Sequence, residues 1–160
     1  MSEKTILLAE DDASHVELFR RALAGSGVAC QLDVVRDGTE VIDYLFAIGQ
    51  HADRKSRLMP DLILLDLKMP RMDGLQVLKV LRRVRGEDRG GFPPIVVLTS
   101  SDLDDNIADA YRWGARSYIR KPLVYAEFAE AVRETVQYWL GLNKPMPPHR
   151  VGVHAVHEGL

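Results

Sequence analysis

Short unbroken apolar runs alternate along this chain with longer segments in which apolar residues recur every three or four positions. The clearest run is Leu62 to Leu65, which follows Pro60. It is too short for an independent helix and lacks the alternation of a half-exposed strand. Such a run is typical of a central strand in a parallel sheet, because that strand is buried on both faces. Thr5 to Ala9 and Ile95 to Leu98 have the same design.

Two weaker strands are predicted at Gln31 to Arg36, which alternates in part as an edge strand does, and at Ser117 to Ile119. The segments between the strands have the spacing of amphipathic helices. Ser14 or Asp12 is expected to cap the first of them. Their apolar faces are Val16, Phe19 and Leu23 in the first, Val41, Ile42, Leu45 and Phe46 in the second, Leu75, Leu78 and Leu81 in the third, and Phe128, Val132, Val136 and Trp139 in the last.

Strand and helix therefore alternate five times. This alternation predicts an α/β fold with a doubly wound, five-stranded parallel sheet covered by helices on both faces. Residues 1–140 are expected to form one domain, and residues 141–160 a C-terminal extension that either forms a dimer contact or is disordered. Gly49 to Met59 is longer than the roughly 2 to 6 residues usual in such connections, so it is either an ornament or a contact surface. Asp102 or Asp104 is expected to cap the fourth helix.

The overall composition narrows the class of protein. With 160 residues, 46% apolar residues and a formal charge of −2, the chain suits one soluble domain. Acidic residues slightly outnumber basic ones, so no nucleic-acid partner is expected. The single Cys30 excludes an intramolecular disulfide, as expected in the reducing cytoplasm. No stretch approaches the roughly 20 apolar residues of a membrane span, so no membrane association is expected.

Four of the predicted strands end in polar residues, which are Glu10 and Asp11 after the first strand, Asp66 after the third, Thr99 after the fourth and Lys121 after the fifth. The carboxyl ends of parallel strands meet at one edge of a sheet, and open α/β sheets bind their ligands there. We therefore expect these groups to converge. Each position taken alone also has a purely structural reading, because acids often cap helices and a strand-end aspartate often forms a turn.

Three acidic residues at one edge require a cation, since two like charges about 4 Å apart repel by roughly 4 kcal/mol at an effective dielectric near 20. Carboxylate oxygens with no His or Cys nearby favour Mg²⁺ over zinc. In this interpretation Asp11 and Asp66 bind the ion directly. Glu10 binds it through water, and the backbone carbonyl of Lys68 completes the shell.

Such an edge suits phosphoryl transfer to a carboxylate, because the loose transition state mainly needs in-line positioning and neutralised oxygens. Asp66 is then the nucleophile and phosphoacceptor. Lys121 pairs with one phosphoryl oxygen as a point charge, and the Thr99 hydroxyl donates to another. The side chain of Lys68 is expected to point out of the site.

Together these residues resemble the receiver domains of two-component response regulators, the CheY-like family. The resemblance covers about residues 4–140 and implies a flavodoxin-like fold with strand order 2-1-3-4-5. It implies that the chain is a phosphoacceptor that catalyses its own phosphorylation and dephosphorylation rather than an enzyme for other substrates. The matching pieces are Glu10-Asp11 after Leu7 to Ala9, Leu65-Asp66 with Met69-Pro70 and Asp73-Gly74, Leu98 to Ser100, and Gly114-Ala115 with Tyr118 to Pro122.

A narrower resemblance concerns the single-domain regulators that partner phytochrome-type histidine kinases. It implies a kinase of the bacteriophytochrome type as partner and a homodimer formed by the fourth and fifth units and the C-terminal extension. Too few residues follow the last helix for a helix-turn-helix output domain, so output is expected by protein contact. The matching pieces are Asp37-Gly38 with Asp43 to Leu45, the long loop before Pro60 to Leu62, Thr99 to Asp102, and Phe128 with Tyr138 to Leu140.

The family resemblance also implies a switch. Phosphorylation of the aspartate draws Thr99 towards the phosphoryl group and lets Tyr118 turn inward, which is a shift between two populations. The Lys-Pro peptide bond of the family is cis, and the same is expected for Lys121–Pro122. Ser100 occupies a position next to the phosphoryl pocket where many receivers have alanine, and Lys68 and Ser101 occupy positions where side chains tune hydrolysis.

Two other classes of protein share part of this pattern. A haloacid-dehalogenase-like phosphohydrolase also uses a strand-end aspartate, but it needs a second aspartate two positions on, where Lys68 stands. A receiver-like scaffold that is never phosphorylated is the other class. His15 is too far into the first helix to be a phosphoacceptor, and it is expected to be exposed and to face the kinase. The histidines of the tail, at 149, 154 and 157, match no ligand spacing on a helix.

Overall fold

A computed structural model of the chain describes residues 3–54, 59–86 and 90–147. Five parallel strands form one sheet in the order β2-β1-β3-β4-β5. The strands are β1 (Lys4–Ala9), β2 (Cys30–Val35), β3 (Leu62–Leu65), β4 (Ile95–Thr99) and β5 (Ser117–Arg120). The doubly wound parallel sheet and its strand order are therefore confirmed.

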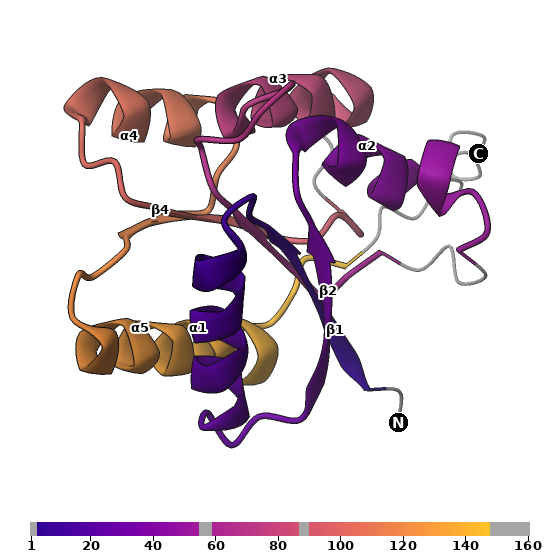
Figure 1. Cartoon of the computed structure of the whole chain (residues 1–160). Coiled ribbons are helices and arrows are strands. Elements are labelled where there is room, and N and C mark those ends of the chain that lie inside the picture. Colours follow the sequence, from indigo (N-terminus) through magenta and orange to yellow (C-terminus); the bar gives the residue numbers. More distant parts are fainter. Residues whose placement is uncertain (1–2, 55–58, 87–89, 148–160) are drawn as a thin grey trace, which may run out of the picture.

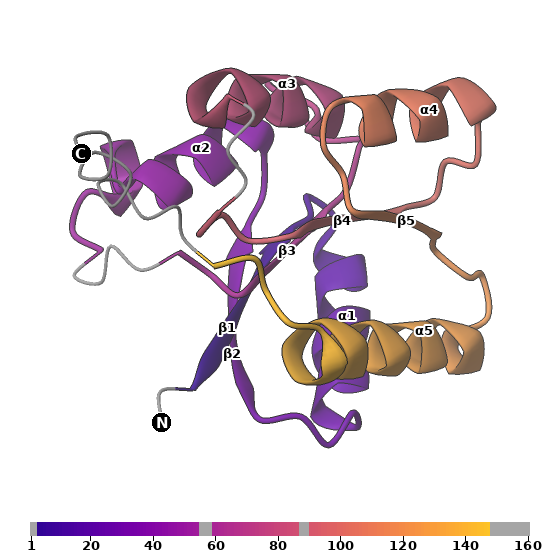
Figure 2. The same ribbon diagram turned by 180° about the vertical axis from the view of Figure 1, so that it is seen from behind.

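The helices that connect the strands are α1 (Ala13–Ala24), α2 (Gly38–Phe46), α3 (Gly74–Arg85), α4 (Asp104–Arg112) and α5 (Tyr125–Gln137). A short 3-10 helix, η1 (Gly49–His51), follows α2, and a π-helical turn, η2 (Tyr138–Leu142), continues α5. Figures 1 and 2 show α2, α3 and α4 on one face of the sheet and α1 and α5 on the other. Within the described residues, no helix is long and apolar enough to cross a membrane.

The central strand β3 packs into both halves of the core. Ile63 and Leu65 join the core below α2, α3 and α4, whereas Leu62 and Leu64 join the core between the sheet and the pair α1 and α5. This alternation follows from the two-residue period of a strand. All four side chains are at most 1% exposed. The unbroken apolar run therefore reflects burial on both faces, as predicted.

The first helix begins and ends at residues that the sequence offers for those roles. Asp12 is the N-cap of α1, and its side chain accepts hydrogen bonds from Ser14 N and His15 N. Gly25 is the C-cap. Of the two capping candidates, Asp12 is the one used, because the cap must precede the residues whose amides it satisfies.

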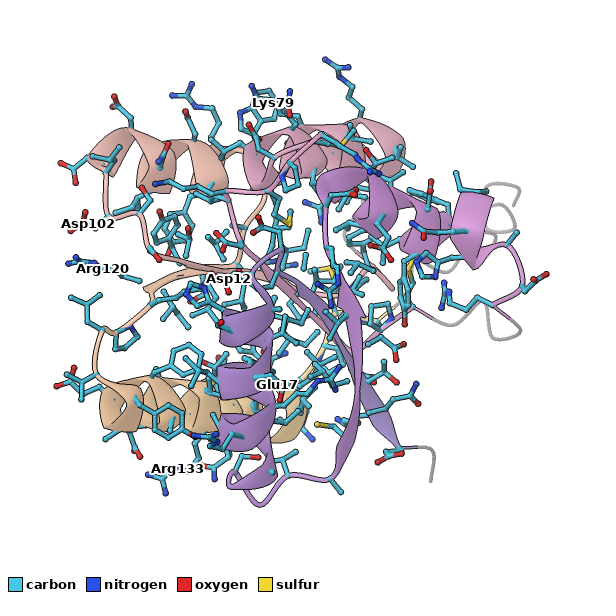
Figure 3. The ribbon with its side chains drawn as sticks, in the orientation of Figure 1. Asp12, Glu17, Lys79, Asp102, Arg120 and Arg133 are labelled. Atoms are coloured by element: carbon cyan, nitrogen blue, oxygen red, sulfur yellow. The ribbon has the colours of Figure 1, made fainter. Side chains whose placement is uncertain are left out.

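The start of α4 differs from the prediction. Its N-cap is Leu103, which makes no side-chain hydrogen bond. The expectation that Asp102 or Asp104 caps this helix is therefore wrong. The carboxylate of Asp102 lies 3.0 Å from the guanidinium of Arg120, and Figure 3 shows the two side chains together at the rim of the molecule. Asp104 is already the first residue of the helix.

The chain after α5 folds back onto its own domain. Leu140 is buried in the core beside α1 and α5, and Lys4 Nζ donates a hydrogen bond to the Leu140 carbonyl at 2.8 Å. Gly91 N also donates to the Met146 carbonyl, at 3.4 Å. The predicted boundary at residue 140 falls inside η2, and the extension as far as residue 147 contacts the domain. Residues 148–160, including the three tail histidines, lie outside the described part.

Candidate functional site

Four strand ends bring their polar side chains together. Thr99 Oγ1 donates a hydrogen bond to Asp66 Oδ1 at 2.9 Å. Lys121 Nζ donates to Asp66 Oδ2 at 2.9 Å and to Glu10 Oε2 at 2.7 Å. All four residues are buried. The predicted convergence of these residues, which are as many as 111 positions apart in the chain, is therefore observed.

Three carboxylates form a cluster at this edge. Oxygen atoms of Glu10, Asp11 and Asp66 all lie within 4.8 Å of one another. Glu10 and Asp66 are 2% and 7% exposed, whereas Asp11 is exposed to solvent. The ammonium group of Lys121 adds one positive charge against three carboxylates, so the cluster has room for a further cation. Hard oxygen donors of this kind fit a divalent cation such as Mg²⁺ or Mn²⁺.

The buried site shifts the pKa values of its two acids in opposite directions. Burial, together with the neighbouring Asp66 carboxylate, raises the pKa of Glu10 to about 7. Burial alone would also raise the pKa of Asp66, but hydrogen bonding with Glu10, the charge of Lys121 and the Lys68 N–H outweigh it, so the net shift is downward. Burial opposes the charge of Lys121, but its two acidic partners raise its pKa overall. Asp66 is thus the ionised member of the pair of buried acids, and its role as the nucleophile stays a prediction.

The loop after β3 is held close to Asp66 by backbone contacts. Lys68 N donates to Asp66 Oδ1 at 3.1 Å, and Gly74 N donates to Leu67 O at 3.0 Å. A Cβ atom at Gly74 would lie 2.4 Å from Asp66 O, so only glycine allows this approach. The side chain of Lys68 is exposed, as predicted. That the Lys68 backbone carbonyl binds a metal ion stays a prediction.

His15 lies beside the buried acids and Lys121. Its Nδ1 lies 3.0 Å from Lys121 Nζ and 3.4 Å from Glu10 Oε1. The assumption that no histidine lies near the carboxylates is therefore wrong. His15 occupies the first turn of α1, shortly after Asp12. The sequence indicates this location only through the short distance between His15 and the carboxyl end of β1.

Of the two residues expected to form a switch, Tyr118 contacts the loop between β4 and α4, and Thr99 contacts Asp66. The Tyr118 hydroxyl donates to the Ser101 carbonyl at 2.7 Å, and Asn106 Nδ2 donates to Ser101 Oγ at 2.8 Å. Thr99 contacts Asp66 directly. The movement of Thr99 and the inward turn of Tyr118 that the family resemblance implies stay predictions.

The peptide bond between Lys121 and Pro122 is trans, since no peptide bond among the described residues is cis. The expectation of a cis bond is therefore wrong. With the trans bond, Lys121 Nζ still reaches both Glu10 and Asp66.

Comparison with known families agrees with this geometry. The model of the response regulator receiver domain matches residues 6–133. The chain therefore belongs to the response regulator receiver family. The strand topology and the side-chain contacts define the same site independently of that match.

Among curated relatives, the probable methanogenesis regulatory protein FilR2 of Methanothrix harundinacea is 36% identical over 143 residues, which cover 89% of this chain and 88% of FilR2. The response regulator Rcp1 of Synechocystis is 30% identical over 86% of this chain and 89% of Rcp1. The chain spans only 27% of the DNA-binding regulator NtrC of Escherichia coli, at 30% identity.

Among solved structures, the phosphorylated cyanobacterial phytochrome response regulator RcpA is similar with a TM-score of 0.79, 35% identity, and coverage of 90% of this chain and 99% of RcpA. The Mn²⁺-bound form of Rcp1 has a TM-score of 0.77, 30% identity, and coverage of 89% and 98%. RPA3017, a response regulator in red light signalling of R. palustris, has a TM-score of 0.78, 30% identity, and coverage of 89% and 97%. One of these similar structures is thus a phytochrome response regulator, and another belongs to red light signalling.

Proposed function

We propose that this chain accepts a phosphoryl group on Asp66 from a phosphohistidine of a histidine kinase, as a single-domain response regulator. The observation that carries the proposal is the environment of the Asp66 carboxylate, which Thr99 and Lys121 contact at 2.9 Å each. An ionised carboxylate held between a hydroxyl and an ammonium group is oriented for nucleophilic attack. The same groups then contact the transferred phosphoryl oxygens.

The transfer step balances as a substitution at phosphorus. One oxygen of Asp66 forms a bond to phosphorus while the bond between phosphorus and the imidazole nitrogen of the donor breaks, and the imidazole keeps the electron pair. Lys121 and Thr99 stabilise the negative charge on the phosphoryl oxygens. Hydrolysis of the resulting aspartyl phosphate by water returns the carboxylate. The chain therefore catalyses its own phosphorylation and dephosphorylation.

Mg²⁺ is the ion that we expect at the carboxylate cluster. Asp11 and Asp66 would bind it directly, the Lys68 carbonyl would complete the shell, and Glu10 would contact it through water. When bound, the ion neutralises the acidic cluster and the phosphoryl oxygens. The all-oxygen donor set and the Mn²⁺-bound form of the similar Rcp1 support this assignment.

The kinase partner that we propose is of the phytochrome type. RcpA is named as a phytochrome response regulator, and RPA3017 is described in red light signalling. Residues 1–140 would form the receiver domain in the cytoplasm, and residues 141–160 would take part in a homodimer. Output would pass by protein contact through the region of Tyr118. The hydroxyl of this residue donates a hydrogen bond to the Ser101 carbonyl, in the loop that follows Thr99.

The haloacid-dehalogenase alternative is less well supported. Its general acid would lie two positions after Asp66, but that position holds Lys68, whose side chain is exposed. A scaffold that is never phosphorylated gives no reason for a hydroxyl and an ammonium group that both contact one buried carboxylate. The match of the receiver family over residues 6–133 also supports the phosphoacceptor.

The proposal is tested by phosphorylation with acetyl phosphate and with a phytochrome-type kinase in the presence of Mg²⁺. Wild-type chain is expected to take up phosphate, and Asp66→Asn is expected to take up none. Asp105→Asn, on the exposed surface of α4, is the matched control and should behave as wild type. Phosphate uptake by Asp66→Asn equal to that of the control would refute the assignment.

A further inference from the structure

A groove of about 650 Å³ follows β2 at the edge of the sheet. Its floor is formed by Leu32, Asp33, Val34 and Arg36, one wall by α1, and the other wall by Tyr44, Gln50, His51 and Arg54. We call it the β2 groove. No residue of the Asp66 site lines the groove. Ala13, at the start of α1, does line it. Figure 1 shows β2 at the border of the sheet with α1 and α2 on opposite sides of it.

The backbone of β2 has a free edge in this groove. Among the described residues β2 pairs with β1 alone. Because Val35 O accepts a hydrogen bond from Glu10 N, the alternation of a parallel ladder turns the N–H and C=O groups of Leu32 and Val34 away from β1. The register runs without a bulge from Cys30 to Val35, and the strand contains no proline or lysine. Such an edge lacks three of the features that protect strands from pairing, and its one charged side chain, Asp33, accepts a hydrogen bond from Tyr44.

The outer wall of the groove is fixed by interactions with the ring of Tyr44. This side chain is 5% exposed, and its hydroxyl donates to Asp33 Oδ2 at 2.5 Å. The Arg54 guanidinium lies 4.4 Å from the centroid of the ring, and the ring of His51 meets it edge-on at 5.3 Å. His51 Nε2 also lies 3.2 Å from Glu40 Oε1. Arg54 and His51, in the described part of the long loop after α2, are therefore packed against the body of the domain.

The charges that line the groove select the kind of occupant. Arg20, Arg36 and Arg54 outnumber the acids Glu17 and Asp33. Asp33 is engaged by Tyr44, and Glu17, which Figure 3 labels on α1, lies 3.8 Å from Arg20. Arg36 is exposed, and its guanidinium has no ion pair within residues 3–54, 59–86 and 90–147. A cationic site for a carboxylate therefore lies at the end of the free edge.

The same charges argue against two occupants from this chain. A second copy would bring its own three groove arginines against these, and like charges facing each other oppose association. The C-terminal residues 148–160 carry one arginine and three histidines against one glutamate, so the tail does not complement the groove either. An acidic segment of another protein fits better.

We propose that the β2 groove docks an extended acidic peptide segment of a partner protein. The segment adds a strand to the sheet beside β2, using the outward N–H and C=O groups of Leu32 and Val34, and places a carboxylate against Arg36. Main-chain hydrogen bonds supply affinity in this mode, and the side-chain charges supply specificity. The proposal does not depend on phosphorylation of Asp66.

The probe is a fluorescein-labelled hexapeptide in which glutamate and valine alternate, titrated with the full chain by fluorescence polarisation. Saturable binding is expected, and a peptide with lysine in place of glutamate should bind at least tenfold more weakly. Arg36→Glu should also weaken binding of the acidic peptide at least tenfold. Arg112→Glu, which reverses an exposed charge on α4, is the matched control and should leave binding unchanged.

Val34→Pro tests the strand itself. This substitution removes an N–H that points away from β1, which an edge strand tolerates, and it should abolish binding of the acidic peptide. Equal binding of both peptides, or unchanged binding by Val34→Pro or Arg36→Glu, would overturn the proposal. Sedimentation that shows pairing of two copies through this edge would overturn it as well. If Val34→Pro does not fold, the Arg36→Glu result and the peptide pair decide.

Discussion

Glu10 is a buried acid whose protonation is expected to change between about pH 5 and about pH 7. Its pKa rises from 4.5 to about 7 because of burial and the neighbouring Asp66. Between these values the folded chain without a divalent ion holds a proton that the unfolded chain has released, so stability falls as the pH rises. We expect the free energy of unfolding in EDTA to fall by about 1 to 3 kcal/mol from about pH 5 to about pH 7.

Urea unfolding at several pH values measures this slope. Added Mg²⁺ should weaken or reverse it, because the ion favours ionised Glu10 and contributes most where that carboxylate is deprotonated. Glu10→Gln removes the titrating group and is expected to flatten the curve in EDTA. A wild-type curve in EDTA that is no steeper than that of Glu10→Gln would contradict the role assigned to this residue.

Lys121 neutralises the buried carboxylates. Lys121→Met leaves Glu10 and Asp66 without their ammonium partner, so we expect a loss of about 3 to 5 kcal/mol in the free energy of unfolding and a large drop in phosphorylation rate. Mg²⁺ should restore part of the stability. Chemical denaturation with and without the ion checks both expectations, and unchanged stability in EDTA would show that the ion pairs are unimportant.

His15 provides the contrasting case. It also contacts Lys121, but its side chain is 39% exposed, so water replaces it as an acceptor when it is removed. His15→Ala should therefore cost less than about 1 kcal/mol in the same unfolding experiment. A loss as large as that of Lys121→Met would mean that His15, rather than the two acids, fixes the lysine.

At the scale of elements, the loop between β3 and α3 depends on one glycine. A Cβ at Gly74 would lie 2.4 Å from Asp66 O and 2.8 Å from Leu67 Cα, both backbone atoms that cannot move alone. Gly74→Ala should lower the free energy of unfolding by about 2 kcal/mol or more and weaken Mg²⁺ binding. Thermal unfolding and isothermal titration with Mg²⁺ check this prediction.

Gly141→Ala is the control, because nothing lies within 4 Å of a Cβ built there. It is expected to unfold and to bind Mg²⁺ as wild type does. If Gly74→Ala matched this control in both measurements, the close approach of the loop to Asp66 would have no role in shaping the site.

The elements themselves could largely be predicted from the sequence. Leu62 to Leu65 are apolar without interruption because both faces of β3 are covered, and a short run of this kind between turn residues is typical of a buried strand. The start of α4 could not be predicted in the same way. Two acids flank it, but Asp102 is paired with Arg120 on a different element, β5. The local sequence does not reveal that an acid near the start of a helix is paired with a distant residue instead of capping the helix.

At the scale of the whole molecule, topology explains why the site could be predicted. Parallel strands end at one edge, so Glu10, Asp66, Thr99 and Lys121 meet once the strand positions are known. His15 was missed because helical periodicity marks it only as a polar position, and the direction of its ring is set by Lys121. The β2 groove was missed because its outer wall depends on side-chain packing around a single tyrosine ring, which periodicity does not reveal.

Self-association is a prediction at this same scale. Leu142 is 78% exposed and Met146 is 53% exposed, so both remain available for a second copy although the chain around them contacts its own domain. Leu142→Glu should weaken dimer formation in sedimentation experiments while changing stability by less than about 0.5 kcal/mol. An unchanged sedimentation mass would discard the role of the extension in a dimer.

The most direct test of the central claim is chemical mapping of the phosphorylated residue. The chain is phosphorylated with acetyl phosphate and Mg²⁺, reduced with borohydride, which converts an aspartyl phosphate to homoserine, and analysed by peptide mass spectrometry. Our account predicts homoserine at position 66 in wild type, and none when Mg²⁺ is replaced by EDTA. Homoserine at another aspartate, or its absence at position 66 under the phosphorylating conditions, would contradict it.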